Sequence, residues 1–277
     1  MSRRLAFLGP RGTYTEEAAL RHDPEAELVP YTGVSAIAAA VESGEIEAGV
    51  APIENSLEGS VNETLDALVH GEQLYIHDEL VLRIDHLLLV KPGVAREDVS
   101  VIFSHPQALA QCRRYIETNF PRAEVVAALS TAAAVEETIG RSDAAAIGNR
   151  RAAEIYGAQP LASSIQDRPN NFTRFVVLAR EDHPPTGRDK TSLAFTFAVE
   201  DRPGLLVSVL SGFASHDINL SKIESRPGGE RLGVYVFLAD IDGHRKDLVL
   251  SQVLSEVSGL CSFFRVMGSY PRCPLPA

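Results

Sequence analysis

The residues with the clearest chemical potential lie where a polar turn meets an apolar strand. Residues 167–171 (DRPNN) are typical of a turn, and residues 172–179 (FTRFVVLA) are typical of a buried strand. Thr173 and Arg174 thus stand at the mouth of a strand, where open α/β folds bind their ligands. On an extended chain, Thr173 and Phe175 share one face and Arg174 points to the other. We therefore expect Thr173 to face a cleft and Arg174 to support it from behind or from the rim.

Composition limits the class of protein. The chain has 277 residues, 45% of them apolar, which favours two domains of roughly 100–200 residues each. Its net charge of −11 argues against nucleic acid and anionic membranes as partners. The N-terminal apolar run is too short for a signal peptide, so we expect a cytoplasmic protein. Cys112, Cys261 and Cys273 are odd in number and widely spaced, which indicates inert thiols and no metal site.

The first 180 residues contain a repeated pattern. Short apolar strands alternate with capped helices, as in an α/β sheet, and the scheme recurs after roughly a hundred residues. The aligned segments are 39–42 with 133–136, both AAVE, and 47–51 (EAGVA) with 143–147 (DAAAI). The repeat predicts two similar lobes with a cleft between them, although Ala-rich helices can also resemble one another by chance.

Two segments are expected to connect these lobes. Residues 80–90 would cross from the first lobe to the second, and residues 172–179 would cross back. This places Thr173 in the hinge, at the floor of the cleft. The catalytic domain would then span residues 1–181, with lobe one at about 1–80 and 172–181 and lobe two at about 81–171.

The chain changes character after Arg180. Residues 181–190 are polar and rich in turn formers, which predicts a linker. Residues 191–270 then follow the order strand, helix, strand, strand, helix, strand. This βαββαβ order is the ferredoxin-like plan.

With these segments in place, the chain resembles a monofunctional prephenate dehydratase with a C-terminal ACT regulatory domain. The motifs that carry the resemblance are residues 9–14 (GPRGTY), 52–56 (PIENS), 104–107 (SHPQ), 171–175 (NFTRF) and 223–227 (IESRP). The resemblance implies a two-lobed α/β catalytic domain like type 2 periplasmic binding proteins, followed by the ACT domain. No chorismate mutase segment precedes Met1, so the monofunctional form is expected.

The family implies a lyase that converts prephenate to phenylpyruvate, with loss of carbon dioxide and water, in L-phenylalanine biosynthesis. Prephenate is a small dianion whose ring becomes aromatic as these groups leave. The protein needs only to hold two carboxylates, assist the departing hydroxyl and position the ring, so no metal or other cofactor is expected. The resemblance also implies feedback inhibition by L-phenylalanine and a homodimer or homotetramer formed through the ACT domain.

The resemblance assigns Thr173 as the catalytic residue, donating a proton or hydrogen bond to the leaving hydroxyl. The expected substrate-binding residues are Asn55, Ser56, Glu54, Ser104, Gln111, Thr13 and Arg174. Glu54 suits a dianion poorly and is better placed to orient its neighbours or to pair with a base. His105 is assigned to capping or packing. The helix N-caps predicted to offer free backbone N–H groups are Thr13, Ser35, Ser104 (for a helix over 106–116) and Ser130.

The expected effector site lies in the C-terminal domain. By position in the family motifs, its residues are Gly204, Leu205, Leu206, Asn219, Glu224, Ser225 and Arg226. Many family members have Ala after this Gly, and the bulkier Leu205 leaves the identity and strength of the inhibitor open.

Two alternative functions stay open. A non-catalytic amino-acid sensor could use both the lobed fold and an ACT domain, but it has no need for Thr173, Asn55, Ser104 and Gln111 together. Arogenate is an alternative substrate that would give phenylalanine directly, and nothing in the sequence decides between it and prephenate.

Overall fold

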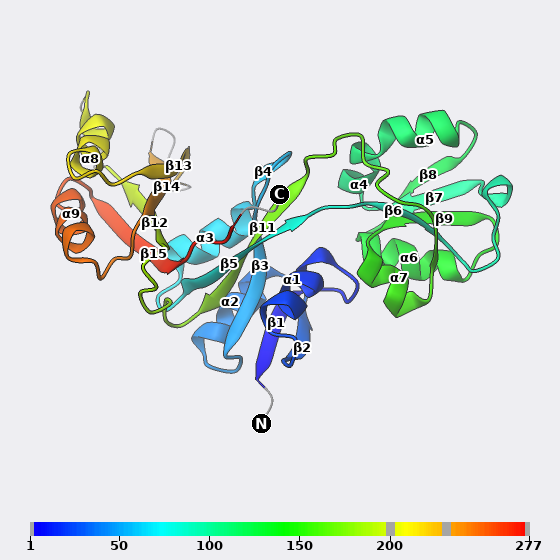
Figure 1. The fold of residues 1–277 in the computed structure, drawn as a ribbon, viewed down its shortest axis with the longest axis horizontal. Coiled ribbons are helices and arrows are strands. Elements are labelled where there is room, and N and C mark those ends of the chain that lie inside the picture. The colour runs from blue at the N-terminus through cyan, green and yellow to red at the C-terminus, as the bar shows by residue number, and fades with distance from the viewer. Residues whose placement is uncertain (1–2, 198–202, 229–233, 275–277) are drawn as a thin grey trace.

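The computed structural model describes residues 3–197, 203–228 and 234–274, which form three units in a row (Figure 1). The first lobe lies in the middle, with the second lobe on one side and the C-terminal domain on the other. Within the described residues, no helix has the length and apolar character needed to cross a membrane.

The first lobe is built on one mixed sheet with the strand order β2-β1-β3-β11-β5, and β4 pairs with β3. Its elements are β1 (Arg4–Leu8), α1 (Tyr14–His22), β2 (Glu27–Tyr31), α2 (Val34–Glu42), β3 (Ala48–Asn55), β4 (Gly59–Ser60), α3 (Asn62–His70), β5 (Tyr75–Arg83) and β11 (Phe172–Ala179). Side chains of α2 and α3 pack on one face of the sheet, and side chains of α1 pack on the other.

The second lobe contains a similar sheet with the order β10-β6-β9-β7-β8. Its elements are β6 (Leu87–Val90), a 3₁₀ turn (Arg96–Asp98), β7 (Val101–Ser104), α4 (Pro106–Gln111), α5 (Arg113–Asn119), β8 (Glu124–Ala127), α6 (Thr131–Ile139), β9 (Ala144–Gly148), α7 (Arg150–Tyr156) and β10 (Gln159–Ala162). The helix predicted over 106–116 is thus two helices, because the chain leaves helical geometry at Cys112.

The two lobes share one plan, as the sequence repeat predicted. The order β2-β1-β3 in the first sheet matches β8-β7-β9 in the second, and the next strand of each sheet, β11 or β6, is the one that the chain forms on arriving from the other lobe. β3 and β9 hold the same position, and so do the Ala-rich helices α2 and α6. The predicted two-lobed α/β plan of the catalytic domain is confirmed.

Two crossing segments form the hinge. One joins β5 to β6 and the other joins β10 to β11, and they pair with each other in between. The N–H of Ile84 donates to the carbonyl of Asn171 at 2.8 Å, and the N–H of Ile165 donates to the carbonyl of His86 at 3.0 Å. Residues 172–179 do not cross between the lobes as predicted, because they form β11 of the first lobe's sheet. Thr173 therefore lies directly beside the hinge and not within it.

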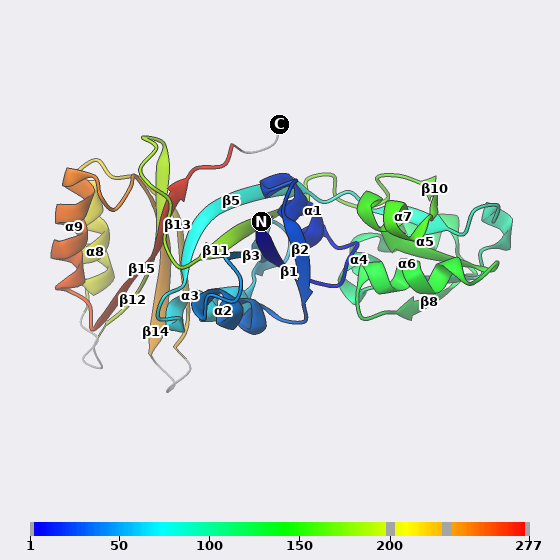
Figure 2. The same ribbon diagram turned by 90° about the horizontal axis from the view of Figure 1, so that it is seen from below.

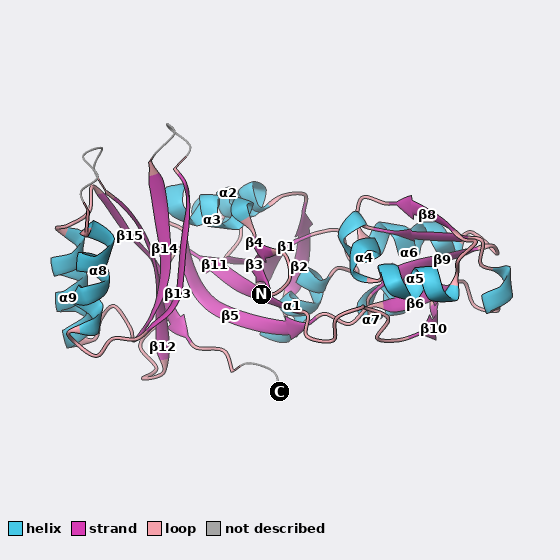
Figure 3. Ribbon diagram, turned by 90° about the horizontal axis from the view of Figure 1, so that it is seen from above, coloured by secondary structure: helices cyan, strands magenta, loops and turns pink. Residues whose placement is uncertain are grey.

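The C-terminal domain is a four-stranded antiparallel sheet with two helices on its outer face (Figures 2 and 3). Its elements are β12 (Asp189–Thr196), α8 (Leu205–Ala214), β13 (Leu220–Pro227), β14 (Tyr235–Asp242), α9 (Leu248–Ser258) and β15 (Phe263–Pro271), in the sheet order β13-β14-β12-β15. The βαββαβ prediction is confirmed. Residues 201–204 (DRPG) and 227–229 (PGG), whose composition predicts turns, fall partly outside the described residues.

The inner face of this sheet packs on the first lobe. Met267 and Tyr270 belong to the same buried apolar cluster as α2 and α3. Gly268 approaches β5 so closely that an added Cβ would lie 2.3 Å from the carbonyl oxygen of Ile76. The predicted linker at 181–190 is wrong as a free connection, because Asp182 is buried and accepts the N–H of Ser269.

Two predicted helix caps are also wrong. The cap of α2 is Gly33, not Ser35, and the carboxylate of Glu63 accepts the free N–H of Val34 at 2.8 Å. The cap of α4 is His105, whose ring accepts the N–H of Gln107, and not Ser104. Thr13 and Ser130 cap their helices as predicted.

The tight approach at Gly268 gives a test of the domain interface. Gly268→Ala should cost about 1–3 kcal/mol beyond its backbone strain, because the methyl group collides with main chain that cannot move aside. We expect the thermal midpoint to fall by roughly 2–4 °C for each kcal/mol lost. Gly93→Ala is the matched control, since Gly93 also has positive φ but an added Cβ meets no described atom within 4 Å. Equal losses in the two variants would contradict a close-packed interface.

Candidate functional site

Strands β3 and β11 position the candidate site. They pair antiparallel, with Thr173 beside Asn55 and Arg174 beside Glu54. Because side chains alternate along a strand, neighbouring pairs face opposite sides of the sheet. Thr173 and Asn55 face the cleft between the lobes, whereas Arg174 and Glu54 face the C-terminal domain.

The cleft is a hollow of about 300 Å³ with lining from both lobes and the hinge. Its lining residues are Leu8, Thr13, Tyr14, Thr15, Pro52, Asn55, Ile84, His86, His105, Gln107, Ala108, Gln111, Leu129, Ser130, Thr131, Asn171, Thr173 and Phe175. No Lys, Arg, Asp or Glu occurs among these described lining residues. The cleft therefore offers neutral hydrogen-bond donors and acceptors beside apolar surface.

Asn55 fixes the orientation of the Thr173 hydroxyl. The Oδ1 of Asn55 accepts the backbone N–H groups of Leu57 at 2.9 Å and Glu58 at 3.1 Å, so its Nδ2 must point the other way. That Nδ2 donates to Thr173 Oγ1 at 2.8 Å. Since Asn55 supplies the proton of this bond, the hydroxyl proton of Thr173 is left for another acceptor.

Two further residues that sequence reasoning did not assign to the site complete it. Asn171 and His86 are 0% and 3% exposed, and both hold Gln111. The Oε1 of Gln111 lies 2.9 Å from Asn171 Nδ2 and 2.9 Å from His86 Nε2. Asn171 stood within the NFTRF motif, but His86 carried no local signal, because only the pairing of the two hinge segments brings it to the cleft.

Thr13 and Gln111 both line the cleft, but Ser104 and Ser56 do not, so their expected substrate contact is corrected. Ser104 is fully buried and donates to the carbonyl of Ile147 at 2.7 Å, which joins two strands of the second lobe. Ser56 accepts the N–H of Phe172 at 2.9 Å and so holds the start of β11. Both residues have structural contacts that explain their presence in the motifs.

Arg174 and Glu54 are turned away from the cleft, which corrects their expected role in substrate binding. The expectations that Arg174 lies behind Thr173 and that Glu54 pairs with a basic side chain are confirmed. The Arg174 guanidinium lies 2.8 Å from Glu79 and 2.8 Å from Asp240, and 3.5 Å from Glu54. The ammonium of Lys190 lies 3.0 Å from Glu79. We call these five residues the interdomain ion cluster, because Lys190 and Asp240 belong to the C-terminal sheet.

The cluster favours the charged forms of Arg174 and Asp240. Burial alone lowers the pKa of Arg174, but Tyr270 and the carboxylates of Asp240, Glu79 and Glu54 raise it well above its ordinary value. Burial likewise raises the pKa of Asp240, and Arg174 and Lys190 reverse this so that the net pKa is lowered. The stability that Asp240 contributes is therefore present above the ordinary Asp pKa and is lost as the pH falls through its lowered value.

The residues expected to bind the effector are spread over the start of α8, the residue before β13, and both faces of β13. On one face of β13, Glu224 accepts a hydrogen bond from Ser60 in the first lobe, and Arg226 pairs with Asp66 of α3. Ser225 is exposed on the other face, and Gly204 caps α8 with a φ of +95° ahead of Leu205 and Leu206. Asn219 donates to Asp242 within the C-terminal domain.

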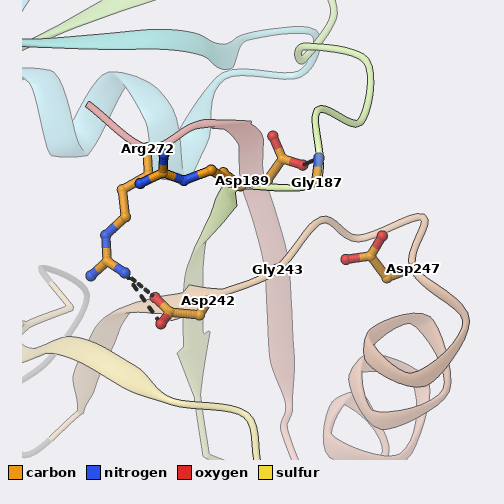
Figure 4. Close-up of a pocket in the computed structure, with 7 residues that line it drawn as sticks. Gly187, Asp189, Asp242, Gly243, Asp247 and Arg272 are labelled. Atoms are coloured by element: carbon orange, nitrogen blue, oxygen red, sulfur yellow. Dashed lines mark hydrogen bonds and ion pairs between the residues drawn. The ribbon is translucent and has the colours of Figure 1, made fainter. Parts of the chain in front are cut away.

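A second hollow of about 260 Å³ lies on the C-terminal domain (Figure 4). Its polar side chains are already paired: Arg272 pairs with Asp242 at 3.2 Å, and Asp189 accepts N–H groups of its own turn.

Burial raises the pKa of the Cys261 thiol to about 11, and burial and nearby Asp167 raise the pKa of the Cys112 thiol further still. These thiols are protonated at neutral pH.

Comparison with known proteins agrees with this geometry. The sequence profile described as "Prephenate dehydratase" matches residues 5–183, and the profile described as "ACT domain" matches residues 195–259. The chain belongs to the prephenate dehydratase family. The prephenate dehydratase of Mycolicibacterium vanbaalenii is 40% identical over 286 residues, covering 96% of this chain and 90% of that protein.

Two solved structures are similar to this protein over nearly its whole chain. The prephenate dehydratase of Arthrobacter aurescens, in complex with L-Phe, is 38% identical with a TM-score of 0.88, covering 97% of this chain and 90% of that one. GqqA, described as a novel type of quorum quenching acylase, is 31% identical with a TM-score of 0.87, covering 98% of this chain and 99% of that one. The shared architecture thus accompanies two different reported activities.

The interdomain ion cluster of this family member can be tested by removing its central cation. Arg174→Met should destabilise the protein by about 3–5 kcal/mol, because it leaves two buried carboxylates with too little positive charge. The thermal midpoint, measured calorimetrically, should therefore fall. Arg113→Met is the control, since Arg113 pairs only with exposed Glu117, and its midpoint should be unchanged. A stable Arg174→Met protein would show that the cluster does not hold the domains.

Proposed function

We infer that this chain is a lyase that converts prephenate to phenylpyruvate, with loss of carbon dioxide and water, in L-phenylalanine biosynthesis. The observation that carries this inference is the free hydroxyl proton of Thr173 at the floor of an uncharged cleft. The family match over residues 5–183 supports the same activity.

The proposed chemistry needs one well-placed proton. As the ring carboxylate leaves as carbon dioxide, its bonding electrons enter the ring, and the hydroxyl on the opposite carbon departs. Thr173 donates its proton to that hydroxyl, which leaves as water, and solvent restores the Thr173 proton. Threonine is a weak acid, so the contribution comes from orientation by Asn55; positioned proton transfer is typically worth about 10²–10⁴ in rate.

The remaining lining residues suit the rest of the substrate. Gln111, Ser130 and Thr131 of the second lobe are neutral donors for carboxylate oxygens, and Ser130 and Thr131 stand at the N-terminus of α6. Leu8, Phe175 and Leu129 supply apolar surface for the ring. Prephenate is favoured over arogenate, because the described lining has no carboxylate to pair with the ammonium of arogenate.

An acylase activity is less well supported. A nucleophilic threonine needs a neighbouring base to take its proton. The neighbour of Thr173 Oγ1 is instead the donor Nδ2 of Asn55, which leaves the hydroxyl as a donor. A pure amino-acid sensor is also disfavoured, because it has no use for this arrangement.

The deciding experiment is to mix purified protein with prephenate and, separately, with arogenate, and to follow phenylpyruvate and phenylalanine. We expect phenylpyruvate from prephenate at the higher kcat/KM. Absence of product from both substrates would overturn the inference, and faster turnover of arogenate would overturn the substrate assignment.

Two conservative variants of Thr173 test its role as a proton donor. Thr173→Val keeps the shape of the side chain but removes the hydroxyl, and it should lower kcat at least about 10²-fold with little change in KM. Thr173→Ser keeps the hydroxyl and should retain most of the activity. Comparable losses in both variants would mean that packing, and not proton donation, is what the site requires.

We also propose that L-phenylalanine inhibits the enzyme by binding the ACT domain. The L-Phe complex of the Arthrobacter relative supports this. Lys222 of β13 lies 3.1 Å from Glu54, the neighbour of Asn55 in β3, and 3.4 Å from Glu224. An effector that shifts β13 would thereby move the back of the strand that orients Thr173. The effect requires a coupling free energy, typically about 1–3 kcal/mol.

Lys222 provides the test of this route. Lys222→Met should keep most of the uninhibited activity but weaken inhibition, raising the L-phenylalanine concentration for half-inhibition roughly 5-fold or more. Arg113→Met is the control, because Arg113 pairs with exposed Glu117 on the second lobe, and it should leave inhibition unchanged. Normal inhibition of Lys222→Met would place the route elsewhere.

Finally, we propose a cytoplasmic homodimer or homotetramer that associates through the ACT domain. Large apolar side chains of Val207, Ile223, Tyr235 and Leu248 are exposed on this domain, which supports their burial by a second copy. All three cysteines are free, which suits a reducing compartment. Light scattering of the purified protein would give the number of copies.

A further inference from the structure

A continuous hydrogen-bond chain links the backbone of the first lobe to His86. The direction of each bond can be worked out from its start, where backbone N–H groups fix Asn55 Oδ1. Asn55 Nδ2 then donates to Asn171 Oδ1 at 2.9 Å, so Asn171 Nδ2 is the group that meets Gln111 at 2.9 Å. The atom of Gln111 at this point must accept and is Oε1. His86 Nε2, also 2.9 Å from Oε1, must therefore carry a proton.

We propose that His86 is a positioning residue that holds the Gln111 amide so that its N–H₂ group faces the substrate. This proposal rests on the dehydratase function proposed above. With Oε1 held by both His86 and Asn171, the Nε2 of Gln111 donates one long hydrogen bond of 3.4 Å, to Glu58. Its other proton is then available to a carboxylate of the substrate. Without His86, the amide could turn over and present an acceptor oxygen to an anion.

The surroundings of His86 hold it in place and keep it neutral. Its backbone N–H donates to Gln166 and its carbonyl accepts from Ile165, so both main-chain groups are fixed within the hinge. Burial lowers the pKa of the imidazole, opposed by the Gln111 bond and the charge of Asp85. The ring edge meets Tyr14, whose hydroxyl donates to the carbonyl of Asp85 at 2.7 Å and lies 3.4 Å from His86 Nδ1.

His86 is not placed to act as the general base itself. A base needs a free lone pair directed at the reacting group. In the tautomer derived above, Nε2 is a donor committed to Gln111, and Nδ1 faces Tyr14 on the side away from Gln111. The role of His86 is exerted through Gln111.

The amide side chains of glutamine and asparagine separate this role from packing. In His86→Gln, the amide nitrogen takes the place of imidazole Nε2, and the donor to Gln111 is kept. In His86→Asn, the amide nitrogen takes the place of Nδ1, and the donor is lost. We expect His86→Gln to keep kcat/KM within about threefold and His86→Asn to lose roughly tenfold, mainly through KM, as for one lost hydrogen bond. Equal losses in both variants would overturn the proposal.

A double-mutant cycle tests whether the effect runs through Gln111. In a Gln111→Met background there is no amide to orient, so His86→Asn should cause no further loss relative to His86→Gln. A tenfold difference that persists in this background would assign His86 a different role. Thermal midpoints of all four proteins, measured alongside, identify any variant whose loss comes from unfolding.

A spectroscopic measurement needs no substrate and so stands apart from the proposed function. With ¹⁵N-labelled histidine, the His86 ring signals are identified by their loss in His86→Gln. We expect the neutral tautomer protonated at Nε2 at pH 7. A ring protonated at Nδ1, or a fully protonated ring, would overturn the hydrogen-bond chain. If the protein turned over neither prephenate nor arogenate, the dehydratase proposal would fail while this measurement still decided the chain.

Discussion

Everything at the site depends on the pairing of β3 with β11 and on the alternation of their side chains. Asn55 and Thr173 form one pair that faces the cleft, and the adjacent pair, Glu54 and Arg174, faces the ACT domain. A shift of register by one residue would exchange these two faces, placing a guanidinium in the cleft and a hydroxyl among carboxylates. The cleft surface and the interdomain contact are therefore two sides of the same two strands, and neither can move without the other.

This arrangement explains why so much charge is buried against the sheet. Buried ion pairs rarely contribute more stability than apolar packing would, but they are demanding about geometry, because each charge must keep its partner. The cluster of Arg174, Glu79, Asp240 and Lys190 therefore restricts how the ACT sheet can sit on the first lobe. Gly268 adds a steric restriction, since its backbone lies against β5 with no room for a side chain. Together they fix the domain interface in one arrangement and place the ACT domain directly behind β11.

Repeated elements and alternating side-chain directions could be predicted from the sequence alone. Two lobes, the βαββαβ order and the opposite directions of Thr173 and Arg174 all follow from local periodicity, and the structure confirms them. Local periodicity could not predict the contacts between segments that are distant in the sequence. Ser104 was expected to cap a helix and bind substrate, but its hydroxyl bonds to Ile147 in a neighbouring strand. Residues 181–190 have the composition of a linker, yet Asp182 is buried by β15, which follows more than 80 residues later. His86 was missed for the same reason, because only tertiary packing brings Gln111 to it.

The hinge connects the hydrogen-bonding groups of the two lobes. Asn171 and His86 belong to the two crossing segments, and both bind Gln111, which is carried by the second lobe, while Asn55 and Thr173 belong to the first. The hydrogen-bond chain therefore passes from one lobe to the other through the hinge itself, so a change in the angle between the lobes must stretch or break one of its bonds. The angle between the lobes and the orientation of the hydrogen-bond donors are therefore coupled. An effector at the ACT domain needs no path through the cleft to alter them, because Lys222 and Arg174 already hold the back of the strands from which the chain begins.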